Sequence, residues 1–167
     1  KNEFVSYAAC GMPYYISDEI SDYRSLLAID KDEFINKRKI AISTFTEVTE
    51  VDFTGKSLQV KSEAGTGTHT WDKLIIATGA SAALPPIPGI ENDGVFVLRT
   101  LRDGLNIKDF VAAKKPESVI LVGGGFISLE LAESFLKTGL KVTLIEKMDS
   151  VASLMSPEIQ QDISEKL

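Results

Sequence analysis

The residues whose spacing most clearly suggests chemistry lie between positions 117 and 147. Gly123, Gly125 and Ser128 occupy the three positions of a G-x-G-x-x-G pattern, and Glu146 follows about twenty residues later. Gly123 lets the chain turn tightly and Gly125 leaves room for a pyrophosphate. Serine at 128 departs from the usual Gly or Ala but is still small enough for helix and strand to pack. A phosphate at this turn would bind free N–H groups at a helix N-terminus, where the helix dipole favours negative charge.

The flanking sequence predicts the two strands and the helix that this pattern needs. Residues 118–122 and 141–145 are predicted as strands, and residues 126–138 as the helix between them. Glu146, at the end of the second strand, suits the free hydroxyls of an NAD ribose and would repel a 2′-phosphate. The sequence therefore predicts a dinucleotide site that prefers NAD to NADP, although the neighbouring Lys147 softens this preference.

Cys10 is the single cysteine of the chain and a candidate for thiol chemistry. The pair Met12-Pro13 predicts a helix start, because proline is tolerated in the first helical turn. Cys10 would then lie just ahead of a helix N-terminus, a setting that favours the reactive thiolate. The alternative is a small buried cysteine that packs as an apolar residue. A single cysteine excludes an internal disulfide framework and fits a reducing compartment.

Composition excludes several classes of function. The 167 residues are 44% hydrophobic and 25% charged, as in a soluble globular protein. No apolar run approaches the roughly 18 residues of a membrane span, and a net charge of −6 argues against a nucleic-acid partner. His69 has no cysteine or acidic cluster nearby, so no metal site is predicted. We expect a cytoplasmic protein, and a first residue other than methionine suggests a slice of a longer chain, cut at both ends.

The remaining elements are predicted from period and turn residues. Residues 31–39 are predicted as a helix whose last turn carries Lys37, Arg38 and Lys39, either a solvated basic end or a patch for an anionic ligand. Residues 100–114 are predicted as a second helix with Thr100 as N-cap, and residues 156–167 as an amphipathic helix that stops without a cap. Short strands are predicted at 40–43, 46–54, 56–63, 68–77 and 95–98, with turns at Gly55 and 65–67; residues 74–77 form the most apolar of these strands.

Three stretches together resemble the pyridine nucleotide–disulfide oxidoreductases. The resemblance is closest to their single-cysteine branch of coenzyme A-disulfide reductases, NADH oxidases and NADH peroxidases. The matching stretches are SYAACGMPYY at 6–15, WDKLIIATGA at 71–80 and GGGFISLE at 123–130, in the order of that family. The resemblance implies an α/β fold, a partial FAD/NAD(P)-binding Rossmann-like fold with a small antiparallel β-meander.

In that family an FAD domain is interrupted by an NAD domain and followed by a dimerisation domain. The resemblance places residues 1–116 in the latter part of the first FAD segment, and residues 117–167 in the first part of the NAD domain. The family's N-terminal glycine motif for FAD and its dimerisation domain are not in the chain. We therefore expect the chain alone to bind FAD poorly and to be inactive, and the full-length protein to be a homodimer.

The resemblance also implies roles for individual residues. Cys10 would be the redox thiol beside the flavin, and Tyr15 stands where other members have a second cysteine. Cys10 would therefore cycle through a mixed disulfide with its substrate or through a sulfenic acid. The residues expected to contact the cofactors are Ala77, Thr78 and Gly79 near the domain junction, Phe126 over the flavin ring, Ile127 next to it in the chain, and Glu130 near the nicotinamide carboxamide.

The implied reaction is hydride transfer from NADH to FAD, followed by passage of two electrons to Cys10. Coenzyme A disulfide or a related small disulfide is the favoured acceptor, with Ser6 and Arg38 as coenzyme A contacts, although Ala9 replaces an asparagine common in the reductases. An NADH oxidase or peroxidase that uses a Cys10 sulfenic acid is the alternative. A third possibility is a nucleotide-binding module with an inert thiol.

Overall fold

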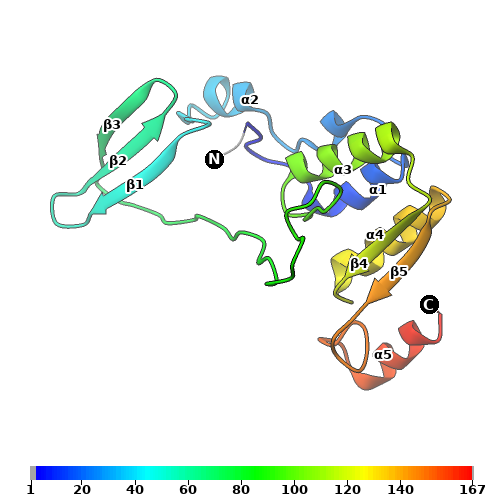
Figure 1. Cartoon of the computed structure of the whole chain (residues 1–167). Coiled ribbons are helices and arrows are strands. Elements are labelled where there is room, and N and C mark those ends of the chain that lie inside the picture. The colour runs from blue at the N-terminus through cyan, green and yellow to red at the C-terminus, as the bar shows by residue number, and fades with distance from the viewer. Residues whose placement is uncertain (1–2, 167) are drawn as a thin grey trace. The chain divides into compact units, whose positions relative to one another are not determined.

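The computed structural model describes residues 3–166, and the chain forms two compact units. The first unit comprises Leu27–Ser81 together with the segment that ends at Tyr7. The second comprises Ala8–Leu26 and the chain from Ala82 onward. Figure 1 labels the helices and strands of both. The expected boundary between the FAD and NAD segments after Pro116 does not coincide with either division and stays a prediction.

The first unit contains the predicted antiparallel meander. Strands β1 (Glu47–Asp52), β2 (Ser57–Ser62) and β3 (Gly65–Thr70) pair in the order β1-β2-β3 (Figure 1). The turn between β1 and β2 is closed by Asp52, whose Oδ1 accepts hydrogen bonds from the N–H groups of Thr54 and Gly55 at 2.9 Å. Helix α2 (Lys31–Asn36) precedes the sheet, and its N-cap Asp30 accepts a 2.7 Å hydrogen bond from the Glu33 N–H.

Several predicted strands of this chain are absent. Residues 40–43, 74–77 and 95–98 form no strand, and Gly65 and Gly67 lie inside β3 rather than in a turn. Ile75 is 88% exposed and Ile76 is 62% exposed. An apolar, β-branched run becomes a strand only where another strand supplies hydrogen-bond partners, and no described segment pairs with 74–77. Local propensity therefore predicted a strand at residues 74–77, but the described residues supply no partner strand for it.

The second unit is built around a parallel strand–helix–strand unit, as predicted. Strand β4 (Ser118–Val122) pairs in parallel with β5 (Lys141–Ile145), and α4 (Phe126–Lys137) connects them. Three further helices belong to this unit: α1 (Met12–Ile16), α3 (Leu101–Lys114) and α5 (Pro157–Ser164). Two short 3₁₀ helices, Ala9–Gly11 and Tyr23–Leu26, flank α1. These elements confirm the predicted α/β class.

The predicted N-cap of α3 is confirmed and forms a reciprocal capping box. The Thr100 hydroxyl accepts a hydrogen bond from the Asp103 N–H at 3.3 Å, and Asp103 Oδ2 accepts one from the Thr100 N–H at 2.7 Å. Gly104, in the second turn of α3, is buried against Met12, whose Sδ would lie 3.5 Å from a Cβ added at Gly104. Glycine therefore weakens the helix locally, and a Cβ at this position would make ordinary van der Waals contact with Met12 of α1.

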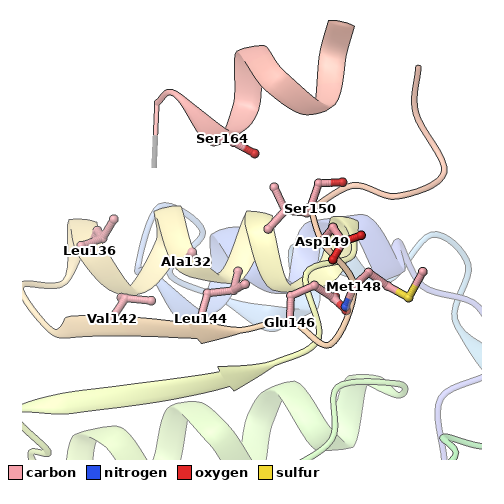
Figure 2. A pocket seen from close by; sticks show the side chains of 10 residues that line it. Ala132, Leu136, Val142, Leu144, Glu146, Met148, Asp149, Ser150 and Ser164 are labelled. Carbon is pink, nitrogen blue, oxygen red and sulfur yellow. The ribbon is translucent and has the colours of Figure 1, made fainter. Parts of the chain in front are cut away.

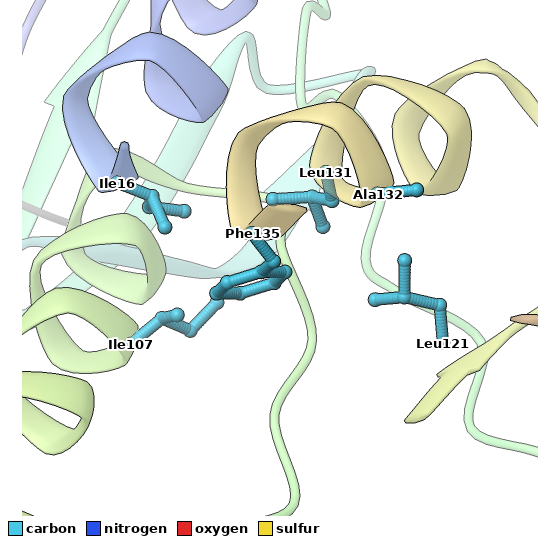
Figure 3. Packing of buried hydrophobic residues seen from close by; sticks show 6 residues of the cluster. All are labelled: Ile16, Ile107, Leu121, Leu131, Ala132 and Phe135. Carbon is cyan, nitrogen blue, oxygen red and sulfur yellow. The ribbon is translucent and has the colours of Figure 1, made fainter. Parts of the chain in front are cut away.

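One apolar cluster joins the helices of the second unit to its sheet. Figure 3 shows Phe135 of α4 between the helices, with Leu121 of β4 on the sheet side. The cluster consists of Ile16, Ile107, Leu121, Leu131, Ala132 and Phe135. The other face of the sheet carries Ile120, Val122 and Ile145, which are exposed. Among the described residues, no helix combines the length and apolarity that a membrane crossing requires.

Phe135→Ala tests whether this cluster holds the second unit together. We expect the substitution to lower the free energy of unfolding by about 3–5 kcal/mol, because it removes a buried ring and leaves a cavity. Urea unfolding followed by circular dichroism measures the change. The control is Leu136→Ala on the same helix, where the side chain is 59% exposed and the expected loss is less than about 0.5 kcal/mol. Equal losses for the two variants would contradict the assignment of the core.

Candidate functional site

The glycine turn after β4 has the backbone geometry predicted for it. Gly123 has φ +99°, a left-handed conformation that side chains other than glycine rarely adopt. Its N–H donates a 2.8 Å hydrogen bond to the Ile145 carbonyl, which holds the turn against the end of β5. Gly125 is the N-cap of α4 and has φ −79°, ψ 177°, an extended conformation open to any residue.

Gly125 provides the test of whether these residues fit a dinucleotide. A Cβ added there would meet no atom within 4 Å, so neither packing nor backbone conformation within this chain requires glycine. No side chain of the described residues caps α4, so the first N–H groups of the helix lie beside this open space. A pyrophosphate needs both room for its oxygens and free N–H donors. The geometry at Gly125 fits it.

Gly124 has a role that the sequence analysis did not assign. A Cβ added there would lie 2.9 Å from Val151 Cγ1 and 3.1 Å from Glu146 Oε2. The Gly124 carbonyl accepts a 2.8 Å hydrogen bond from the Ala152 N–H, which ties residues 146–152 onto the turn. Packing therefore requires glycine at 124. The run of three glycines at 123–125 was the feature of the sequence that could have indicated this requirement.

Glu146 lies at the end of β5, as predicted, and its carboxylate closes the glycine turn. Its Oε1 accepts a 2.7 Å hydrogen bond from the Met148 N–H, and its Oε2 accepts a 2.5 Å hydrogen bond from the Gly124 N–H. The backbone N–H groups of Met148 and Gly124 hold the pKa of this carboxyl below its usual range. The side chain therefore stays ionised, and each oxygen keeps a lone pair that can accept from a ribose hydroxyl.

A pocket of about 470 Å³ lies beside Glu146, within the size range of ligand pockets. Figure 2 shows it between α4, β5 and α5, with apolar side chains at one end and Glu146, Met148 and Asp149 at the other. Its lining residues are Ala132, Leu136, Val142, Leu144, Glu146, Met148, Asp149, Ser150, Val151 and Ser164. Of the residues predicted as cofactor contacts, only Glu146 lines this pocket.

The other predicted contacts on α4 lie in its first turns. Phe126 and Ile127 are exposed, as is Glu130, and Ser128 is half-buried. Phe126 and Glu130 are four residues apart and therefore lie on the same face of the helix. The structure thus brings Phe126, Ile127 and Glu130 together beside the open N-terminus at Gly125.

Cys10 lies in the 3₁₀ helix Ala9–Gly11, directly before α1, and its thiol is exposed and free. The helix start predicted at Met12-Pro13 is therefore confirmed, and within this chain Cys10 is not buried as an apolar packing residue. Gly11 packs against Leu26 so tightly that an added Cβ would lie 2.4 Å from Leu26 Cδ2. Tyr15, at the position of a second cysteine, is buried.

The remaining predicted site residues belong to the first unit, whereas Cys10, the glycine turn and Glu146 belong to the second. Ser6 is half-buried, and Ala77, Thr78 and Gly79 form an exposed irregular segment in which Gly79 has φ +67°. Arg38 is exposed, lies 3.7 Å from a Glu33 carboxylate oxygen and stacks over the Phe34 ring at 5.8 Å. Within the described chain, no three His, Cys, Asp or Glu residues gather as metal ligands.

Known proteins resemble this chain over its full length. It is 37% identical over 166 residues to an NAD(P)H sulfur oxidoreductase (CoA-dependent) of Pyrococcus abyssi, covering 99% of this chain and 36% of that protein. It is 33% identical over 169 residues to a coenzyme A disulfide reductase of Staphylococcus aureus, covering 100% of this chain and 38% of that protein. The chain thus spans little more than a third of the curated relatives it matches.

A solved structure and a family description agree with these relatives. The crystal structure of reduced Bacillus anthracis CoADR-RHD superposes with a TM-score of 0.94 at 32% identity, covering 99% of this chain and 30% of that one. Residues 2–167 match the family described as pyridine nucleotide-disulphide oxidoreductase. With its glycine turn, its acid at the end of β5 and its α/β fold all in place, the chain belongs to the pyridine nucleotide-disulphide oxidoreductase family.

Proposed function

We propose that this chain is part of a flavin-dependent oxidoreductase that passes electrons from NADH through FAD to Cys10. Coenzyme A disulfide, or a related small disulfide, is the acceptor that we favour. The observation that carries the nucleotide half of this proposal is the open space at Gly125, which nothing within the chain explains. The sulfur half is supported by two relatives whose names describe coenzyme A-dependent sulfur chemistry.

The nucleotide would be held by backbone and carboxylate groups of the second unit. The N–H groups at the start of α4 would bind the pyrophosphate, and Glu146 would accept hydrogen bonds from the adenosine ribose. The ionised carboxylate would repel a 2′-phosphate, which favours NAD over NADP. Phe126, Ile127 and Glu130, exposed on the first turns of α4, are the proposed contacts toward the nicotinamide and flavin.

Cys10 would carry out the sulfur chemistry as a single thiolate. It would attack one sulfur of the substrate disulfide, forming a mixed disulfide and releasing the other half as a thiolate. FAD, when bound, would supply two electrons taken as hydride from NADH, which cleave the mixed disulfide and restore the thiolate. Because Tyr15 stands where other members would have a second cysteine, Cys10 would form no disulfide with that position.

Coenzyme A binding is proposed for Ser6 and Arg38 of the first unit. The guanidinium of Arg38 lies 3.7 Å from Glu33, a distance typical of a weak surface ion pair. Such a pair costs little to exchange for a phosphate, which guanidinium groups bind with two parallel hydrogen bonds. Residues 77–79, an exposed segment, are the proposed cofactor contact near the domain junction.

The state of Cys10 in the full-length protein tests the acceptor. Purified without reductant, the protein is expected to carry a coenzyme A or other thiol adduct on Cys10, as measured by intact mass and peptide mapping. Cys10→Ser, which cannot form the adduct, is the matched control. Added oxygens on Cys10 in place of a thiol adduct would favour the oxidase or peroxidase alternative. An unmodified thiol that reacts no faster than free cysteine would leave only a nucleotide-binding module.

Two neighbouring glycines separate ligand binding from folding. Gly125→Ala is expected to leave stability unchanged but to weaken NADH binding about tenfold or more, because a lost contact to a charged group is worth roughly 1.5–3 kcal/mol. Gly124→Ala is expected to lower stability by about 1–3 kcal/mol, because its Cβ would overlap Val151 and Glu146. Calorimetric titration with NADH and urea unfolding measure the two effects. Loss of stability in Gly125→Ala without loss of NADH affinity would contradict the proposed pyrophosphate site.

Glu146→Gln tests whether Glu146 binds the hydroxyl groups of the adenosine ribose. We expect NADH affinity to fall relative to NADPH affinity, because the carboxylate that excludes a 2′-phosphate is gone. Stability should also fall at neutral pH, since an amide cannot accept from both Gly124 and Met148. A lowered carboxyl pKa stabilises the fold above the pKa of the unfolded chain, and this contribution is lost as pH falls through the folded value. The stability difference between variant and parent should therefore vanish in acid, and a difference independent of pH would contradict the assignment.

A further inference from the structure

Lys108 of α3 makes a set of contacts that the proposed function does not use. Its Nζ donates a 2.6 Å hydrogen bond to the Tyr15 carbonyl and forms a 2.7 Å ion pair with Asp18 Oδ1. The same ammonium lies 3.9 Å from the centroid of the Tyr15 ring. The Lys108 side chain is only 18% exposed, so these three contacts replace most of its water. All of them are made to the end of α1.

Helix α1 depends on such contacts because it is only five residues long. A helix of this length is not stable by itself in water, so tertiary contacts must hold its conformation. Its last turn is followed by Asp18 at φ +65°, a left-handed conformation that is unfavourable for a residue with a side chain. Lys108 binds a carbonyl of the last turn of α1 and the side chain of Asp18, and a cation at a helix C-terminus is favourable.

The face of α3 that carries Lys108 also contacts the start of α1. Gly104, one helical turn earlier, packs against Met12. Met12 is the first residue of α1 and follows Cys10 by two positions. Gly104 thus meets the start of the short helix and Lys108 its end. Two points of contact on one rigid helix fix both the position and the direction of α1.

We propose that Lys108 is a positioning residue for Cys10, because it anchors the short helix that begins directly after the cysteine. The anchoring of α1 by Lys108 is argued from the contacts alone. Its effect on catalysis rests on the proposed function of Cys10. Cys10 itself is exposed, and its backbone is held by Gly11 against Leu26 and by α1. Release of α1 at its C-terminal end would let the thiol sample other directions and would lower the fraction aimed at a substrate disulfide.

Cys10 is the single cysteine, so a nitroxide spin label attached to it reports on this segment alone. In Lys108→Met, which keeps the apolar stem but removes the ammonium, we expect the spectrum to shift toward the mobile component. Lys108→Arg, which keeps the charge and donors, should restore much of the immobilised component. Lys114→Met, an exposed lysine on the same helix, should match the parent. A merely destabilising effect would lower the melting temperature without shifting the spectrum of the folded protein toward the mobile component.

A second measurement separates this proposal from the proposed function. The rate at which unlabelled Cys10 reacts with a small aromatic disulfide should exceed that of free cysteine in the parent and fall severalfold in Lys108→Met. If the parent reacts no faster than free cysteine, the redox role of Cys10 fails, and the spin label still decides the role of Lys108. An unchanged spectrum in a folded Lys108→Met would overturn the proposal.

Asp18→Asn covers the case in which Lys108→Met does not fold. Asparagine tolerates the left-handed conformation at 18 and keeps the Lys108 bond to the Tyr15 carbonyl, but it removes the ion pair. Its spectrum is expected to lie between those of the parent and a fully released segment. If Lys108→Met does not fold, a parent-like spectrum in Asp18→Asn would overturn the proposal.

Discussion

The hydrogen bond between the Glu146 carboxylate and the Gly124 N–H is the constraint on which the proposed nucleotide site depends. It joins the end of β5 to the turn that follows β4, while the Ala152 N–H binds the Gly124 carbonyl from the other side. The turn is thereby fixed with Gly125 and the start of α4 facing open space. Without this bond, the carboxylate of Glu146 and the glycine turn would move independently. A dinucleotide bound as proposed would contact both, so their rigid connection would lower the entropy that binding must lose.

The second unit also connects the thiol segment to the nucleotide helix. Helix α1 packs on α3 and on α4, and Ile16 shares one apolar cluster with Phe135. Polar contacts run the same way, since Lys137 of α4 forms a 3.0 Å ion pair with Glu19 beyond the end of α1. Cys10 therefore lies at one end of a short helix whose other end is bound by both of its neighbours. An exposed thiol in this unit does not imply a loosely held one.

Local sequence patterns were sufficient to predict the elements whose stabilising contacts are made between residues close together in the chain. The strand–helix–strand unit followed from periodicity, and the Thr100 cap and the Met12-Pro13 helix start followed from single turns. One failure was local, since the turn expected at residues 65–67 lies inside β3. The other failures were long-range. Residues 74–77 have strand propensity but no partner strand, and the packing of Gly124 depends on Val151, far along the chain. Lys108 and Tyr15 are 93 positions apart in the sequence, and no local pattern around either residue predicts their contact.

Tyr15 is a buried packing residue at the position where, under the proposed function, other members have a second cysteine. Burial raises the pKa of its phenol, and the nearby carboxylates of Asp109 and Asp18 raise it further, so the ring stays neutral. A tyrosine has no sulfur and cannot form a disulfide. With its pKa raised, this ring, which lies against the Lys108 ammonium, also does not titrate near neutral pH. The position that would hold a resolving thiol is therefore filled by a packing residue. Under the proposed function, Cys10 must then form its bond to sulfur or oxygen with an atom from outside this chain, and its exposure allows such an atom to approach.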